Sequence, residues 1–370
     1  MVISPLNVLM NNQVTHWQRK GVRCVALHQE SEVDLQSLQL TSYEIIFTSP
    51  EMALSQEFRT RMTLQFRQSV CVVAFDEAHC IAEWGLSQFR PQYANVTELM
   101  SLVSHAPVLV TTATLSETMR EEIFSVLHLS QYETIAINPD RPEIYIDVKL
   151  PDKHTFDWLV KALIVHKQDT PKTIVYCRSI NQVTTVFERF LSALHDNIYV
   201  DPDNKVPDNR LVEMFSSAIV ESSKTRILSA FSTDSNLRVV ISTVAFGMGI
   251  DIPDIRNVIL WGIPAGVCQY WQEVGRACRD GQPGRAMIVM EPVPSKLPRS
   301  EELKALFDSH ETCYRKAILE KLWLLEMGDL PKSQGSCSSH CRSCNCIKCT
   351  CCTVCRDACP CNASDTDNDD

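Results

Sequence analysis

The chain has 370 residues, of which 45% are hydrophobic and 22% are charged, a composition typical of a folded globular protein and not of a disordered one. The uncharged apolar stretch over residues 257–272 is interrupted by glycine and proline and is too short to cross a bilayer, so no membrane segment is expected. The N-terminus lacks a basic region before an apolar core, which argues against a secretory signal and favours an intracellular protein.

The net charge of −10 includes four aspartates in the last six residues, which leaves −6 for the remainder. This balance does not by itself indicate nucleic-acid binding, although a protein that holds one strand needs only a local basic and polar track. Ten of the seventeen cysteines lie between Cys337 and Cys361. In a reducing compartment, such a cluster in a large hydrophobic chain favours metal ligation over disulfides.

Short β-rich runs alternate with helical stretches along the chain, which is the pattern of parallel α/β sheets. The strands predicted in a first series are residues 22–26, 44–47, 70–75 and 108–112. After a predicted linker at residues 141–143, those of a second series are residues 173–176, 238–242, 257–261 and 286–290. Three prolines between Pro292 and Pro298 mark a boundary, and apolar spacing predicts a helix over about residues 301–326.

Two carboxylates follow a predicted buried strand directly. Residues 72–75 run into Asp76 and Glu77, which places both acids at the carboxyl end of the strand, where α/β folds form their ligand crevice. Phosphoryl transfer uses such a pair, with Asp76 holding Mg²⁺ while Glu77 orients and deprotonates the attacking water. Taken alone, the segment is equally well explained by a solvated helix start with an aspartate cap.

An aromatic and basic loop comes next and contains Trp84, Phe89 and Arg90. Such a loop can stack on bases and sense the nucleotide, although isolated aromatics more often pack within their own loop. The letters DEAHC, then Trp-Gly, then Phe-Arg-Pro-x-Tyr resemble motif II and the aromatic-rich loop of the RecQ-like superfamily 2 DNA helicases. The resemblance covers about Val2 to Cys344.

Further segments lie in the family's order. Residues 4–14 resemble motif Ia, with Asn12 where the family usually has aspartate, and residues 48–51, 112–114 and 175–178 resemble motifs Ib, III and IV. Hydroxyls and backbone amides at such loops contact phosphates without reading sequence. The resemblance implies DNA contacts by Ser4, Pro5, Trp84, Phe89, Arg90, Arg178 and Thr243. Ser216 stands where many members have a histidine, which puts one further DNA contact in doubt.

Residues 243–251 and 272–281 resemble motifs V and VI, with Cys278 in place of a small residue. The resemblance implies catalytic roles for Gln272, Arg276 and Arg279. The two arginines are spaced i and i+3, which predicts one helix face from which both reach a γ-phosphate across the interlobe cleft and stabilise transition-state charge. The alternative is a solvated basic face that is balanced by neighbouring acids.

The cysteine-rich tail predicts a zinc site. Cys313 opens a predicted helix, and Cys337-x3-Cys341-x2-Cys344 would supply three more thiolates at about 2.3 Å from a tetrahedral Zn²⁺. This arrangement resembles the zinc-binding domain that follows the motor in this family. A rival trio is Cys352-x2-Cys355-x3-Cys359, and the further candidates are Cys346, Cys349, Cys351 and Cys361. The alternative is a low-complexity thiol tract without a specific metal.

The phosphate-binding pattern G-x-x-x-x-G-K-[ST] is missing, since none of the eleven glycines is followed by lysine. The resemblance places Met1 inside the motif Ia strand, so the first lobe is expected to be incomplete. Either the sequence is a truncated gene model or isoform of an ATP-dependent helicase, or it is a product that kept strand-binding loops and lost hydrolysis. The persistence of Asp76, Glu77 and the two arginines favours truncation.

The resemblance therefore implies two tandem RecA-like parallel-sheet α/β lobes, the first incomplete, followed by a small helical zinc-binding subdomain. The implied domains are residues 1–140, 141–295, 296–361 and an acidic disordered tail over 362–370. The implied function is an ATP-dependent 3′–5′ DNA helicase of repair or recombination that uses ATP, Mg²⁺ and Zn²⁺, acts on single-stranded or forked DNA and is located in the nucleus. The alternative is an ATPase-dead adaptor that binds nucleic acid or protein.

Overall fold

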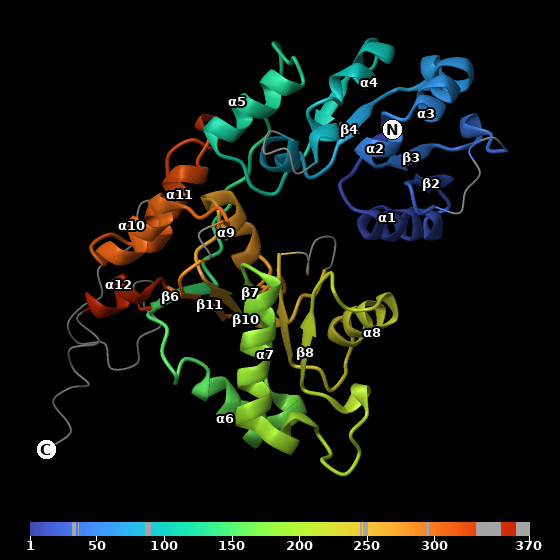
Figure 1. Ribbon diagram of the computed structural model, residues 1–370. Helices are drawn as coiled ribbons and strands as arrows, with labels where there is room; N and C mark the ends of the chain where they lie inside the picture. Colours follow the sequence, from blue (N-terminus) through green and yellow to red (C-terminus); the bar gives the residue numbers. More distant parts are fainter. Residues whose placement is uncertain are drawn as a thin grey trace, which may run out of the picture. The chain divides into compact units, whose positions relative to one another are not determined.

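The computed structural model describes residues 1–31, 35, 37–85, 90–244, 246, 251–293, 296–330 and 349–359. The chain divides into two compact units, Met1–Ala136 and Ile137–Asp370, and each is built on one parallel sheet (Figure 1). Within the described residues, no helix combines the length and the apolar character that crossing a membrane requires.

The sheet of the first unit has five parallel strands in the order β2-β3-β1-β4-β5. The strands are β1 (Val2–Ile3), β2 (Cys24–Leu27), β3 (Ile45–Thr48), β4 (Val73–Phe75) and β5 (Val108–Val110). The two residues of β1 pair with β3 on one side and β4 on the other, so this short strand lies inside the sheet. The carboxyl ends of β1, β3 and β4 consequently lie next to one another.

Helices cover both faces of this sheet. The helices are α1 (Asn7–Arg19), α2 (Pro50–Ala53), α3 (Gln56–Arg61), α4 (Thr97–Leu102) and α5 (Glu117–Val126). Met10 of α1 packs on Cys24, Ala26 and Phe47 from one side, and a larger apolar cluster occupies the other side. Three helices begin at a serine whose hydroxyl accepts a backbone N–H, a cap that satisfies a donor the helix leaves unpaired.

The second unit has six parallel strands in the order β6-β11-β10-β7-β9-β8. They are β6 (Ile144–Lys149), β7 (Lys172–Cys177), β8 (Val212–Phe215), β9 (Val239–Ser242), β10 (Ile255–Trp261) and β11 (Gly284–Val289). Every residue of β7 is buried, as expected for an inner strand of a parallel sheet with both faces covered. At Gly284 a Cβ would collide with the Arg256 carbonyl and the Cys278 sulfur, so glycine permits the close approach of β10 and β11 there.

Two layers of helices enclose the second sheet. Its helices are α6 (Asp157–His166), α7 (Ile180–Leu194), α8 (Glu221–Ser232), α9 (Val267–Val274), α10 (Glu301–Ser309), α11 (Tyr314–Leu322) and α12 (Thr353–Asp357). α6 and α7 bury leucine, valine and phenylalanine against the sheet. An aromatic group of Tyr270, Phe307 and Tyr314 joins α9, α10 and α11.

The single helix predicted over residues 301–326 is wrong. α10 ends at Ser309, His310 adopts a left-handed backbone with φ 48°, and α11 begins at Tyr314. The break allows α11 to pack on α9, and it places Cys313 at the N-terminus of α11.

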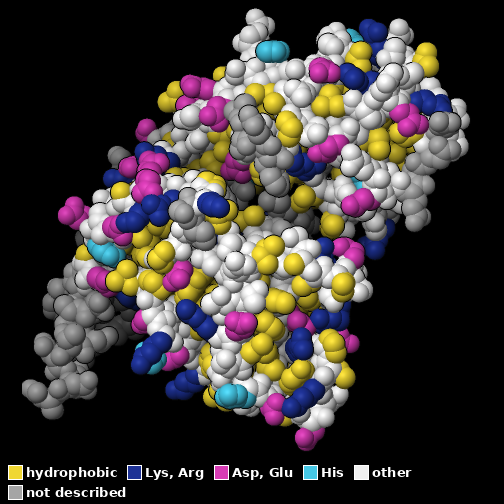
Figure 2. Space-filling view, viewed as in Figure 1, with side chains coloured by type: hydrophobic (Ala, Val, Ile, Leu, Met, Phe, Trp, Pro, Cys, Tyr) yellow, Lys and Arg dark blue, Asp and Glu magenta, His cyan; other side chains and the backbone are white. Residues whose placement is uncertain are grey.

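The short helix α12 lies beside the edge strand β6 (Figure 1). Cys352, which caps α12, forms a parallel bridge with Ile146 of β6. On the face shown in Figure 2, Lys and Arg side chains alternate with Asp and Glu and do not gather in one basic patch, in agreement with the acidic net charge.

Candidate functional site

The two predicted catalytic carboxylates lie at the carboxyl end of β4. The N–H of Asp76 donates to the Ile3 carbonyl at 2.9 Å, so the ladder with β1 continues up to the first acid. The Asp76 carboxylate accepts the Glu77 N–H at 3.0 Å and the Thr111 hydroxyl at 3.3 Å. Glu77 has φ 51°, a left-handed conformation that is costly for a non-glycine residue and marks a sharp turn after the strand. Both acids are partly exposed and therefore accessible to a ligand.

The same turn is tied to the segment that follows β5. His79 Nδ1 lies 3.3 Å from Glu77 Oε2 and 3.1 Å from the Thr112 hydroxyl, which in turn donates to the Thr114 carbonyl. The Ala78 N–H donates to the Thr111 carbonyl at 2.9 Å. A shift of the acidic turn would therefore be transmitted to Thr111 and to residues 112–114, the segment that resembles motif III.

Arg90 connects three of the predicted motifs within the first unit. Its Nε and Nη2 donate to both oxygens of Glu51 at 2.9 and 2.7 Å, and its Nη1 donates to the Pro5 carbonyl at 2.5 Å. The guanidinium also lies 5.5 Å from the Trp84 ring centre and 5.4 Å from that of Tyr93. Arg90 thus holds the Ia-like and Ib-like segments against the aromatic loop.

The predicted DNA-contacting residues of this unit differ in accessibility. Ser4 and Pro5 are buried, and the Ser4 hydroxyl has no partner among the described residues. Trp84 is partly exposed and packs edge to face on Tyr93. Phe89 lies outside the described residues. In this arrangement Trp84 is the predicted contact in this unit best placed for a base to stack on it.

The Arg90–Glu51 pair gives a prediction about stability and pH. Burial raises the pKa of Glu51, but the hydrogen bonds and the charge of Arg90, together with the carboxylate's hydrogen bonds to its own backbone and to Ser49, outweigh burial and hold the pKa below its ordinary value of 4.5. Since the folded pKa is the lower one, the stabilisation is complete above about pH 4.5 and is lost as the pH falls through the folded pKa.

We expect Glu51→Gln to lower the free energy of unfolding by about 2 kcal/mol at pH 7, as for a lost charged hydrogen bond, and by much less at pH 3. Urea unfolding at both pH values measures the difference, with the exposed Glu57→Gln on α3 as the control. An equal loss at both pH values would contradict the ionic origin of the effect.

In the second unit, the segment predicted to carry two arginines on one helix face has a different shape. α9 ends at Val274 with Gly275 as its cap, and Arg276 lies in the turn beyond. Cys278 then adopts a left-handed backbone with φ 57°, so Arg276 and Arg279 do not share a helix face and the prediction is wrong on that point. We call residues 275–280 the arginine loop. Arg279 is exposed and lies 2.8 Å from Asp251.

Arg178 occupies a buried ion pair. Its Nη1 and Nη2 donate to both oxygens of Glu273 on α9 at 2.8 and 2.7 Å, and the two side chains are 5% and 6% exposed. Gln269 donates to the same carboxylate at 3.0 Å. Arg178, a predicted DNA contact, thus joins the end of β7 to α9 in this structure. Gln272 on α9 and Thr243 after β9 are partly exposed.

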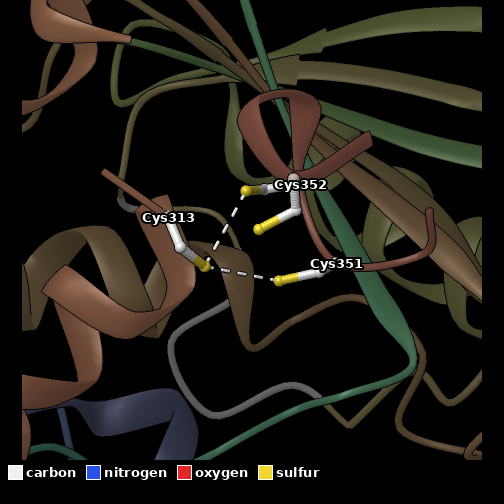
Figure 3. A group of neighbouring side chains, drawn as sticks. Cys313, Cys351 and Cys352 are labelled. Atoms are coloured by element: carbon white, nitrogen blue, oxygen red, sulfur yellow. Dashed lines mark hydrogen bonds between the residues drawn. The ribbon is translucent and has the colours of Figure 1, made fainter. Parts of the chain in front are cut away.

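Four cysteines converge near the start of α11. The sulfurs of Cys313, Cys351, Cys352 and Cys355 lie within 4.8 Å of one another, and we call these residues the cysteine cluster. Figure 3 shows the side chains of Cys351 and Cys352 directed toward Cys313, whose sulfur lies 3.6 and 4.0 Å from theirs. Four sulfurs at about 2.3 Å from a tetrahedral Zn²⁺ would be roughly 3.8 Å apart. The donor set and its spacing therefore fit zinc.

The electrostatics of the cysteine cluster favour a thiolate. Hydrogen bonds from Cys313 and Cys351 hold the pKa of the Cys352 thiol far below its ordinary value. Burial raises the pKa of Cys355 to about 12 in the absence of a cation. A bound cation would stabilise the charged form of each of these thiols.

The four cysteines of the cluster match neither of the two predicted sets of zinc ligands. It joins Cys313 of the first set to Cys352 and Cys355 of the rival set and to Cys351, while Cys359 is buried outside the cluster. Cys337, Cys341, Cys344, Cys346 and Cys361 lie outside the described residues. The spacing Cys-Cys-x-x-Cys at 351–355 is the sequence signal that would have identified the trio.

Comparison with known proteins agrees with these features. A model of the DEAD/DEAH box helicases matches residues 1–122, and one of the helicase conserved C-terminal domain matches residues 154–281. The chain is 29% identical over 339 residues to the ATP-dependent DNA helicase RecQ of Pasteurella multocida, covering 90% of this chain and 49% of that protein. The chain belongs to the RecQ-like helicases of superfamily 2.

A second relative of this RecQ-like chain is the ATP-dependent helicase wrn-1 of Caenorhabditis elegans, 30% identical over 309 residues, covering 79% of this chain and 27% of that protein. The chain thus spans about half of one relative and about a quarter of the other. Among solved structures, Saccharomyces cerevisiae Dbp5 bound to RNA and ADP BeF3 superimposes with a TM-score of 0.61 at 17% identity, covering 90% of this chain and 76% of that one. This likeness shows the fold, two RecA-like lobes with parallel sheets.

Proposed function

We propose that the protein containing this chain couples ATP hydrolysis to 3′–5′ movement along single-stranded DNA and unwinds forked DNA. The observation that carries the proposal is the acidic turn after β4, where Asp76 accepts the Thr111 hydroxyl and Glu77 faces His79, which contacts Thr112 of the segment resembling motif III. The printed names of the RecQ and wrn-1 relatives, both ATP-dependent helicases, support the same reaction.

Individual residues of this chain have separate roles in the proposed hydrolysis of ATP. Asp76 would hold Mg²⁺, which when bound neutralises phosphate charge. Glu77 orients the attacking water and removes its proton. Arg276 and Arg279 of the arginine loop stabilise the charge that develops on the transferred phosphoryl group, with Gln272 nearby on α9. Trp84 offers a stacking surface for a base.

Hydrolysis also needs backbone amides and a lysine around the phosphates, and this sequence contains no such loop. The proposal therefore requires a phosphate loop in addition to these 370 residues. We propose a nuclear location only because the proposed substrate is DNA. Imaging of a tagged protein tests this location.

The proposal is tested by comparing this chain with the same chain preceded by the phosphate-loop segment of a RecQ relative. We expect DNA-stimulated phosphate release and unwinding of 3′-tailed duplexes only from the extended chain, and no unwinding of 5′-tailed ones. Salt-sensitive, ATP-independent strand binding without hydrolysis by either chain would favour a non-enzymatic adaptor instead. Stimulation by RNA alone would overturn the choice of DNA.

We further propose that the cysteine cluster binds one Zn²⁺. The four thiols come from two segments, Cys313 at the start of α11 and the turn leading into α12. A metal would therefore join the start of α11 to the turn that leads into α12.

A further inference from the structure

A continuous path of hydrogen bonds joins the cysteine cluster to the arginine loop, and both ends of it lie in the second unit. The path passes through the segment 139–144, which precedes and enters β6, and through two arginines, Arg141 and Arg315. The sequence alone predicts a linker at residues 141–143, and the structure ties this segment by hydrogen bonds to the arginine loop and to α11.

Arg141 forms the end of the path at the arginine loop. Its Nη1 donates to the Gly275 carbonyl at 3.1 Å, and its Nη2 donates to the Ala277 and Cys278 carbonyls at 2.8 and 3.0 Å. Carbonyls just beyond a helix end lack helical partners, and a cation there also faces the negative end of the helix dipole. One guanidinium thus binds carbonyls on both sides of Arg276 and the one directly before Arg279.

The position of Arg141 is itself fixed. Its Nε donates to Glu143 at 2.5 Å, and its backbone N–H donates to the Asp140 carboxylate at 2.8 Å. The neighbouring Pro139 carbonyl accepts the indole N–H of Trp271 on α9 at 2.8 Å. These contacts hold the segment against the last turn of α9.

Arg315 forms the middle of the path. It lies on α11 two residues after Cys313, is 8% exposed, and donates from Nη1 to the Asp140 carboxylate at 2.8 Å and to the Arg141 carbonyl at 2.7 Å. Its Nη2 donates to the Ile144 carbonyl and, at 3.4 Å, to the Cys351 carbonyl. A lysine could not form these diverging bonds, because its ammonium lacks the planar fork.

The cysteine end is attached to the sheet as well. The Cys351 carbonyl also accepts the Ile146 N–H at 3.1 Å, and Cys352 continues the pairing along β6. The backbone of two cluster cysteines therefore contacts both Arg315 and the edge strand. A change in the geometry of the cluster must displace at least one of these partners.

We propose that Arg315 and Arg141 are positioning residues through which metal binding at the cysteine cluster sets the conformation of the arginine loop. The consequence for catalysis rests on the proposed function, since it is there that Arg276 and Arg279 act on the nucleotide. The coupling itself does not depend on hydrolysis.

Amide hydrogen exchange of the 370-residue chain tests the coupling without any nucleotide. Amides at 275–278 donate to backbone carbonyls, so their protection is measurable. We expect removal of zinc by a chelator to speed exchange in peptides covering the arginine loop by about tenfold or more, while peptides from β7 and β10 keep their protection. Zinc added back should restore the slow exchange.

Arg141→Gln separates the two ends of the path. We expect the loop to exchange about tenfold faster with zinc present, with little further change on chelation, while bound zinc and the protection of residues 351–359 stay as in the wild type. Arg315→Lys, which keeps the positive charge but lacks the planar fork, should likewise speed exchange in the loop with zinc present and leave little further change on chelation. Arg356→Gln, at a partly exposed arginine on α12, serves as the control and should leave the loop unchanged.

Two results would overturn the proposal. One is wild-type loop protection that chelation leaves unchanged although exchange at 351–359 rises. The other is an Arg141→Gln loop that responds to zinc as fully as the wild type. Because neither readout involves ATP, the coupling can be tested even if the 370-residue chain does not hydrolyse ATP.

Discussion

Replacement of Glu77 by glutamine is expected to lower ATP hydrolysis by at least about a hundredfold in a chain completed by a phosphate loop, because a positioned general base contributes that much or more. The measurement is steady-state phosphate release with saturating single-stranded DNA. Glutamine matches the shape of glutamate but cannot accept the proton of the attacking water, so DNA binding should change little.

The structure indicates that the Glu77→Gln variant should keep the wild-type fold. Glu77 is about one-third exposed and its carboxylate faces the buried His79 at 3.3 Å, a distance at which a glutamine amide still fits. The backbone strain at φ 51° is the same for both side chains. Unfolding temperature should therefore stay close to that of the wild type.

The exposed Glu121→Gln on α5 is the matched control, since it removes the same charge from the same unit. Hydrolysis that survives in Glu77→Gln but disappears in Asp76→Asn would contradict the role given to Glu77. It would leave Asp76 as the essential acid.

The acidic turn was predictable from sequence because its signal is local. A run of β-branched and aromatic residues leads directly into two acids, and a parallel strand of this kind exposes whatever follows its carboxyl end. Strands β7, β9, β10 and β11 were likewise recognisable, since apolar residues dominate each of them. Their predicted limits differ from the observed ones by at most two residues.

Two strands of the second sheet were missed for an equally physical reason. β6 contains Asp147 and Lys149, and β8 contains Glu213, so neither reads as a buried apolar run. Asp147 is buried with Arg285 and Thr353 as partners, and Glu213 with Arg210 and Arg226. Such acids are tolerated in strands because basic side chains, Arg226 and Arg285 among them from other elements, neutralise them.

The conformation of the arginine loop could not be predicted from the local sequence either. The spacing of Arg276 and Arg279 is helical, but Cys278 turns left-handed and Arg141, more than 130 residues away, binds the carbonyls that a continuing helix would use. The ligand set of the cysteine cluster likewise depends on contacts between residues that are distant in sequence. Many trios satisfy the spacing rules, and only the docking of α12 on β6 selects one.

The cysteine cluster yields the other large expected effect. Wild-type chain should contain about one zinc per molecule, and Cys352→Ser should reduce this to near zero, because a structural zinc site depends on all four of its ligands. Elemental analysis by mass spectrometry after dialysis measures the content. Cys352 is the sharpest position, since its sulfur contacts Cys313 while its backbone pairs with β6.

Cys359→Ser is the matched control, because Cys359 is equally buried in the same segment but lies outside the cluster. It should retain zinc. A variant with Cys337, Cys341 and Cys344 all changed to serine should retain it too. Zinc that is lost from this triple variant but kept by Cys352→Ser would overturn the assignment and return the site to the ligands first predicted from spacing. Zinc lost from both would also contradict the assignment, because it would mean that one site needs ligands from both groups of cysteines.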